Sequence, residues 1–448
     1  MTSGIEMTRM TPLWAVGPFV LYLLLIAGLP LVHGRFWEHN RNKLLVAAIL
    51  SAPVLGYLFS IKGSGALAEV LHVLLDYATF VALLGALFTV SGGIGLRGAL
   101  PGSPGVNLVF LSVGAVLSSL IGTTGASVLL IRPLLRANER RVSSTHVVVF
   151  FIFIVSNTGG LLTPLGDPPL FLGFLRGVPF LWTLRLFAQW AFVNGALLAI
   201  FAVLDRVLLA RERRTPGDAA TAPSSETGPL SLEGGLNFVW LLGLIGFVFA
   251  LGARGEQWLG SSHLRSFVEI AGLTVLAALS FFTTPAAIRE QNRHEWAPLL
   301  EVAAVFIGVF ITMTPALSYL AERGGSLGII RPAQFFWASG GLSSLLDNAP
   351  TYLAFTSLAQ GVVSGGAAPA GASLAALSAH PVGERLLVAI ACGSVMMGAL
   401  TYIGNGPNFI VKAIAEQHHV RMPGFFGYLR WSLLILVPLF AIVSLLFF

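Results

Sequence analysis

The sequence predicts an all-α polytopic membrane protein with two related halves, and three observations lead to this fold class. First, 55% of the 448 residues are hydrophobic and only 10% are charged, too few charges to cover a soluble protein of this size. Second, apolar runs of about 20 residues recur along the chain, each long enough to cross a bilayer as a helix. Third, one long apolar stretch in each half is interrupted near its middle. Barrel strands would instead show short alternating segments.

The apolar runs predict about ten spanning helices. The first is interpreted as a retained span, with a cleaved signal peptide as the alternative. The spans are expected at roughly 13 to 33, 43 to 61, 70 to 91, 145 to 175, 184 to 204, 236 to 252, 264 to 282, 297 to 318, 385 to 411 and 428 to 448.

Two further apolar stretches, 107 to 135 and 332 to 358, favour re-entrant hairpins. The first is broken at Gly122-Thr123-Thr124-Gly125 and the second at Asp347-Asn348-Ala349-Pro350. Such breaks are tolerated at membrane depth where surrounding protein or a wet cavity satisfies the freed backbone groups. Two helices joined by a loop across the membrane are the alternative.

Basic residues predict the orientation. If both broken stretches are hairpins, most of the 26 Lys and Arg residues fall on one face, which is then cytoplasmic, and both termini lie outside. Because these residues serve topology, the net charge of +6 does not indicate nucleic-acid binding. Linker composition at 206–235 predicts a first transmembrane repeat at 1–205, a cytoplasmic linker at 206–235 and a second repeat at 236–448.

Three matches between the halves predict an internal repeat, although an old duplication kept only for packing is the alternative. Five spans and one hairpin precede the linker, so the repeats are expected to be inverted, which places a substrate near the midplane between broken helices. The matched segments are Leu-Ser-Ser-Leu at 117 and 342, Gly85 and Thr89 with Gly308 and Thr312, and Thr163 to Pro169 with Thr401 to Pro407.

The fourth predicted span contains Asn157, Thr158, Thr163 and Asp167 among glycines and prolines that prevent a regular helix. An unwound segment exposes carbonyl groups, and these side chains add oxygen atoms of the kind that a small hard cation prefers. The segment is therefore a predicted cation site. A proline kink with Asp167 at the outer interface is the alternative.

Asp347, in the second hairpin tip, is the other acidic candidate. An acid deep in the membrane is a functional hypothesis by default, although Asp347 would equally serve as a helix cap. Because a carboxylate binds either H⁺ or a cation, Asp167 and Asp347 are the predicted Na⁺ ligands of an exchange site. Across the pseudo-symmetry, Asp167 is paired with Asn405 and Asp347 with Thr123. The neutral binding residues are expected to be Thr123, Thr124, Asn348, Thr351 and Asn405.

Asp76 and Glu301 occupy similar positions in the third and eighth predicted spans. They are predicted as proton-relay or gating acids. The alternative is an interfacial pair with a neighbour such as His72 or His294.

The motifs resemble a known family. Asn157-Thr-Gly-Gly160 with Thr163-Pro-Leu-Gly-Asp167 is similar to the Asn-Ala-Gly-Gly and Ser-Pro-Ile-Gly-Asp signature of D-type bacterial sodium/proton antiporters, and Asp347-Asn-Ala-Pro350 resembles their Asp-Asn-Val-Pro. These antiporters belong to the ion transporter superfamily, which includes citrate symporters, dicarboxylate carriers and arsenite-pump membrane subunits. The resemblance implies inverted repeats with hairpins and a bacterial inner-membrane location.

Two differences between this sequence and the motifs of the superfamily bear on the identity of the substrate. The dicarboxylate carriers place Ser-Asn-Thr at both hairpin tips, whereas here Ser156 to Thr158 lies in a spanning helix. The segment Gly404 to Asn408 is closer to citrate-carrier-like members. We therefore expect a Na⁺ (or Li⁺)/H⁺ antiporter, with cation-coupled symport of citrate or a similar anion as the alternative. No enzyme activity or cofactor is expected, lipid is the surrounding medium, and a homodimer is compatible with the sequence.

Overall fold

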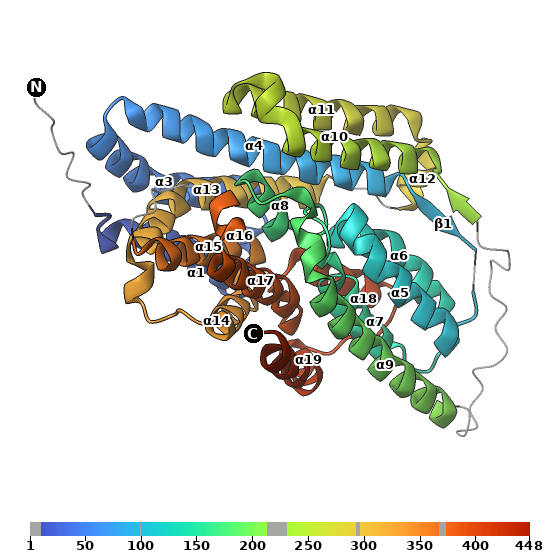
Figure 1. Ribbon diagram of the computed structural model, residues 1–448. Helices are drawn as coiled ribbons and strands as arrows, with labels where there is room; N and C mark the ends of the chain where they lie inside the picture. The colour runs from blue at the N-terminus through green and yellow to red at the C-terminus, as the bar shows by residue number, and fades with distance from the viewer. Residues whose placement is uncertain (1–9, 99, 213–230, 293–295, 367–372) are drawn as a thin grey trace, which may run out of the picture.

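The computed structural model describes residues 10–98, 100–212, 231–292, 296–366 and 373–448 (Figure 1). It confirms an all-α membrane fold, in which the described part has a single two-stranded sheet and ten helices long and apolar enough to span a bilayer. That number equals the prediction, but one member differs. Pro104–Ile121, predicted as a hairpin arm, qualifies by length and composition, and the predicted span 145 to 175 does not, because it is broken.

The first half ends in a helix that continues past residue 205, where the linker was predicted to begin. Its elements are η1 (Leu13–Val16), α1 (Gly17–Val32), α2 (Gly34–Trp37), α3 (Asn40–Lys62), α4 (Gly65–Gly92), β1 (Gly95–Arg97), α5 (Pro104–Ile121), α6 (Thr123–Ala137), α7 (Thr145–Ile154), η2 (Thr158–Leu161), α8 (Pro168–Leu175), η3 (Phe180–Leu186) and α9 (Phe187–Glu212).

The second half has the same order of a hairpin followed by a broken span and a final long helix. Its elements are β2 (Ser231–Glu233), α10 (Leu236–Leu259), α11 (Ser262–Thr283), α12 (Ala286–Gln291), α13 (Ala297–Arg323), η4 (Gly324–Ser326), α14 (Pro332–Ser343), α15 (Asn348–Ser364), α16 (Ala375–Ala379), α17 (Pro381–Met396), η5 (Met397–Leu400), α18 (Gly406–Gln417) and α19 (Phe425–Phe447).

Both predicted breaks coincide with hairpin tips. Helix α5 ends at Ile121 and α6 begins at Thr123. Gly122 lies between them, and its φ of 80° permits an abrupt reversal that a residue with a side chain would resist. Helix α14 ends at Ser343 and α15 begins at Asn348. The arms of each hairpin pack against each other.

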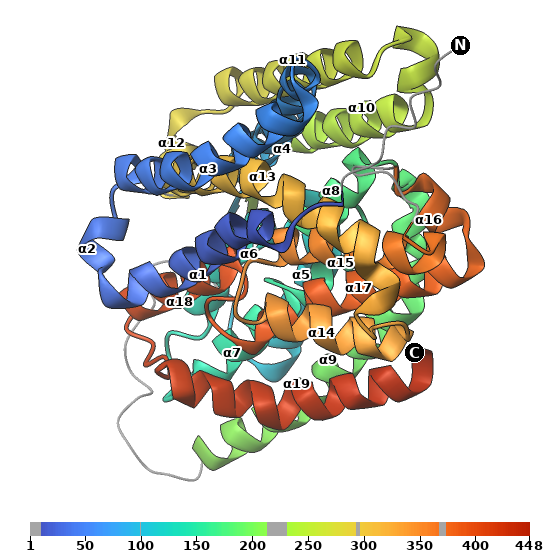
Figure 2. The ribbon, with the colours of Figure 1, turned by 90° about the vertical axis from the view of Figure 1, so that its left-hand side faces the viewer.

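The two broken spans form the centre of the molecule. Every residue from Val147 to Val155 in the first is at most 1% exposed, and 78% of the window Pro381–Leu400 in the second is buried, against 17 to 44% for the other spans. Helices α4, α10 and α11 lie together on one side of this centre, and α9 and α19 lie on another (Figures 1 and 2). The broken helices are thus shielded from lipid by the regular spans.

Contacts between connecting segments sort the helix ends into two sides. On one, which we call the linker side, β1 pairs with β2, and Thr145 Oγ1 donates to the Arg421 carbonyl. On the other, the terminal side, Thr11 Oγ1 donates to Glu322 at 2.8 Å, and Phe448 packs on Phe336. Hairpin α5–α6 starts from the linker side and α14–α15 from the terminal side. The inverted relation of the two halves stays a prediction.

Candidate functional site

Asp167 is the centre of the candidate site. Two consecutive prolines follow it at the first positions of α8, where the missing N–H groups cost nothing because a helix leaves its first amides unpaired. Asp167 occupies the N-cap position without capping, so its carboxylate is available for other contacts. Only 2% of the residue is exposed.

The two hairpin tips converge on this carboxylate. Thr123 Oγ1, at the start of α6, donates to Asp167 Oδ1 at 2.9 Å. Asn348 Nδ2, at the start of α15, donates to Asp167 Oδ2 at 2.5 Å. Both donors are the first residue of the second hairpin arm. The residue that corresponds to Thr123 is therefore Asn348, and the predicted pairing of Thr123 with Asp347 is off by one position.

Asn348 also carries an oxygen that no described residue satisfies. The residue is 1% exposed, and its Oδ1 has no hydrogen-bond partner within the described part of the chain. A buried carbonyl oxygen without a donor is costly, so such an atom beside a buried carboxylate is suited to binding a cation.

A cavity of about 120 Å³ reaches Asp167 from one direction. Thr123, Thr124 and residues of α4 line it, and none of its described lining residues is Lys or Arg. It shares Phe88, Pro298 and Ile410 with a second cavity of about 180 Å³. The second cavity extends to Arg132 and Gln417. Because Gln417 ends α18 at the linker side, the two cavities together lead from Asp167 toward that side.

A network of asparagine side chains joins the two broken spans. Asn157 Nδ2 donates to Asn408 Oδ1 at 2.7 Å, and Asn405 Nδ2 donates to Asn157 Oδ1 at 3.1 Å. Asn408 in turn donates to the carbonyls of Gly398 and Thr401. The predicted residues Asn157 and Asn405, together with Asn408, therefore hold the unwound segments together. Asn405 also forms a side-chain hydrogen bond with Asp167, whereas no hydrogen bond links Asn157 to Asp167 in the described contacts.

The other two predicted residues of the first broken span, Thr158 and Thr163, form hydrogen bonds with neighbouring elements and, in the described contacts, not with Asp167. Thr158 Oγ1 donates to Asn194 Oδ1 on α9 at 2.7 Å. Thr163 Oγ1 donates to the carbonyl of Ser119 in the first hairpin. They orient the unwound segment around Asp167.

The same hydrogen bond recurs in the second half. Thr401 Oγ1 donates to the carbonyl of Ser344 at 2.5 Å, as Thr163 does to Ser119. The sequence repeat aligns these two pairs. Asp167 and Asn405 also have nearly equal backbone angles, φ −149° and ψ 144° against φ −152° and ψ 137°. The repeated geometry supports the internal repeat that the motifs predict.

Asp347 takes the role of a helix cap. Its Oδ1 accepts a hydrogen bond from the Ala349 amide at 3.0 Å, and Thr351 Oγ1 donates to its carbonyl. The residue is half-buried and is not among the residues that line the cavity at Asp167. The structure thus brings Asn348, rather than its neighbour Asp347, into contact with Asp167. Whether Asp347 binds a cation stays a prediction.

Asp76 and Glu301 lie in different surroundings. His72 Nε2 is 3.8 Å from Asp76 Oδ2. Glu301 forms an ion pair of 2.8 Å with Lys43, whose side chain is 2% exposed. His294 lies outside the described residues. The pairing of Glu301 with Lys43 was not predicted, because the two residues are 258 positions apart in the chain.

Three residues that form hydrogen bonds with the predicted site residues were not predicted from the sequence: Ser119, Asn194 and Asn408. Each joins elements that are not adjacent in the chain. The largest separation is that of Asn408 from its partner Asn157, which is 251 residues. The repeat contained a signal for Ser119, since the Leu-Ser-Ser-Leu match includes it. Asn194 and Asn408 have no counterpart in any matched motif.

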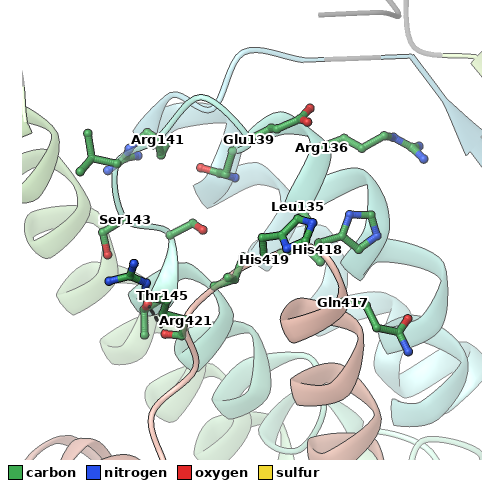
Figure 3. Close-up of a pocket in the computed structure, with 14 residues that line it drawn as sticks. Leu135, Arg136, Glu139, Arg141, Ser143, Thr145, Gln417, His418, His419 and Arg421 are labelled. Carbon is green, nitrogen blue, oxygen red and sulfur yellow. Dashed lines mark hydrogen bonds between the residues drawn. The ribbon is translucent and has the colours of Figure 1, made fainter. Parts of the chain in front are cut away.

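A wider cavity of about 1040 Å³ lies away from Asp167, on the linker side. Figure 3 shows His418 and His419, from the loop after α18, facing the segment that carries Ser143 and Thr145. It is an open groove between loops of the two halves and does not reach the buried carboxylate. Among the described residues, no three His, Cys, Asp or Glu side chains are grouped so as to hold a metal ion.

Ten helices of the described chain are long and apolar enough to span a bilayer, and they include one hairpin arm and part of the second broken span. With the two broken spans and the two hairpin tips, they define the chain as a multi-pass membrane transporter. A family model described as "Putative citrate transport" matches residues 8–448, nearly the whole chain. The chain belongs to this family, which places it in the citrate-transporter-like ion transporter superfamily. No curated protein matches it.

Proposed function

We propose that this transporter exchanges Na⁺ (or Li⁺) for protons at Asp167 by alternating access. The observation that carries the proposal is the buried carboxylate of Asp167. Its described hydrogen-bond partners are the Thr123 hydroxyl and the side-chain amides of Asn348 and Asn405, and its cavity has no basic residue in the described lining. An ionised carboxylate is costly to bury without a counter-ion. A bound cation or a proton removes that cost, and the two compete for the same oxygen atoms.

The hairpin tips supply the other oxygen ligands in this proposal. Thr123 Oγ1 is already within hydrogen-bond distance of the Asp167 carboxylate. A half-turn of the Asn348 side-chain amide replaces the donating Nδ2 with Oδ1, the atom that lacks a partner. The same two residues thus serve both states, since they donate to the empty carboxylate and direct oxygen atoms at a bound cation.

The inverted halves supply the alternating access. The hairpins reach Asp167 from opposite sides, so related movements of the two would open the site to either side. The cavities toward Gln417 correspond to a state open to the linker side, which we assign to the cytoplasm because basic residues are concentrated there. In this proposal 1–205 and 236–448 are the repeats, and Asp347 holds Asn348 in place by capping α15.

Symport of citrate or a similar small anion with cations is the second candidate. The family description favours it, and so does the guanidinium of Arg132 in the adjoining cavity. The N-terminus of α6 also lies at the site, and the end of a helix of this polarity stabilises an anion.

Proton flux in proteoliposomes distinguishes the two candidates. With a pH-sensitive dye inside the vesicles, we expect an inward Na⁺ gradient alone to drive protons out, because exchange at Asp167 needs no other solute. K⁺ in place of Na⁺ is the matched control. A flux that requires added citrate would refute antiport and support the symporter.

A further inference from the structure

A second charged cavity lies on the terminal side of the candidate site. Its volume is about 470 Å³, and α4, α11, α13 and the end of α8 form its walls. We call it the α4–α11 cavity. Its charged lining residues include three acids and three bases: Glu69, Asp76, Glu269, Lys62, Arg176 and Arg265. Such a concentration of charge between membrane spans is a functional hypothesis by default.

Helix α8 lies between this cavity and Asp167. Asp167 is the N-cap of the helix and Arg176 is its C-cap, so its eight residues span about 12 Å between the two sites. The Arg176 carbonyl accepts a hydrogen bond from Leu374 at 2.7 Å, which fixes this end near the segment that follows α15. The cavity therefore lies on the side of Asp167 opposite to the cavities that lead to Gln417.

Glu269 is a buried acid of this cavity whose carboxylate is not fully satisfied by hydrogen bonds from the described residues. The residue is 2% exposed, and its Oε1 has no hydrogen-bond partner among the described residues. Arg265 and Asp76 are the charges that act on it. A buried carboxylate oxygen that no structural contact satisfies is available for a proton.

Asp76 lies deeper along α4 and faces a different set of charges. Its side chain is 16% exposed, and His72 and Arg176 act on it. Lys62 and Glu69 pair with each other at 2.6 Å near the start of the helix. The wall formed by α13 contributes neutral groups such as Thr314 and Ser318.

We propose that Glu269 and Asp76 form a proton relay between the aqueous phase on the terminal side and Asp167. A proton from water binds the Glu269 carboxylate and passes to Asp76. When the site opens to the terminal side, the proton passes through water to Asp167, which releases its cation. Each carboxylate gives up the proton that it gained, so the step needs no further reactant. Arg265 and Arg176 offset the negative charge of the relay when it is ionised. The inference rests on the proposed exchange of Na⁺ for protons.

The variant Glu269→Gln tests the relay by separating proton movement from cation movement. We expect the Na⁺-driven proton flux to fall about a hundredfold, the scale of losing a proton-transferring group. Exchange of radioactive Na⁺ for unlabelled Na⁺ should stay at the wild-type rate, since it needs Asp167 but no proton. Asp76→Asn should behave in the same way, and Glu269→Asp should recover part of the flux.

The control is Glu384→Gln, which removes an acid of the same side that pairs with Arg185 outside the cavity. Wild-type proton flux in Glu269→Gln would overturn the relay and leave the exchange at Asp167 standing. Loss of both proton flux and Na⁺/Na⁺ exchange would also overturn it, because the residue would then be structural. If the wild type itself shows no Na⁺-driven proton flux, the proposed function fails and the relay fails with it.

Discussion

Replacing Asp167 with Asn is expected to abolish coupled transport while leaving the protein folded. The amide has nearly the shape of the carboxylate, and its oxygen still accepts a hydrogen bond from Thr123. It binds no proton and supplies no charge to a cation, so the Na⁺-driven proton flux should fall about a hundredfold or more. The flux is measured in proteoliposomes with equal amounts of wild-type and variant protein.

The matched control for this variant is Glu384→Gln, an acid in an exposed pair with Arg185. Its flux should equal that of the wild type. A normal flux in Asp167→Asn would exclude this carboxylate as the exchange site.

Replacing Asp205 with Ala is expected to cause the largest loss of stability. Asp205 is fully buried and contacts three groups: Arg141 Nη1 at 2.8 Å, His146 Nε2 at 2.9 Å and Asn107 Nδ2 at 3.0 Å. Removing one partner of a buried ion pair leaves the other charge uncompensated and costs about 3 to 5 kcal/mol. The network joins α9 to the hairpin α5–α6 and to α7, so thermal unfolding in detergent should begin at a clearly lower temperature.

Glu212→Gln is the matched comparison, because Glu212 also pairs with Arg141, at 3.0 Å, but is partly exposed. We expect it to cost at most about 1 kcal/mol. Equal unfolding temperatures for the two variants would mean that the buried network does not stabilise the fold in the way described.

The backbone of the site was largely predictable from the sequence, because it depends on local chemistry. Gly122 marks the first hairpin tip and Pro168 marks the restart of the first broken span, and each acts through its own backbone geometry. The repeat added a second, independent signal at Thr163 and Thr401. These features need no knowledge of which helices are neighbours.

The side-chain contacts were less predictable, because they depend on helix rotation and long-range packing. Asp347 was favoured over Asn348 since it carries a charge, but Asp347 precedes α15 with an extended backbone and its side chain turns back to cap the Ala349 amide, whereas Asn348 donates to Asp167. The asparagine network and the Asp205 cluster join segments that no periodic pattern pairs. Asp205 and Asn107 are 98 residues apart.

The most direct test of the central claim is proton release from the purified protein. In weakly buffered detergent solution, adding Na⁺ to the wild type should displace the proton from Asp167 and acidify the medium, whereas adding K⁺ should not. The variant Asp167→Asn should release no proton under the same conditions. Equal proton release from the variant and the wild type, or none from the wild type over the pH range in which it transports, would contradict cation and proton exchange at Asp167.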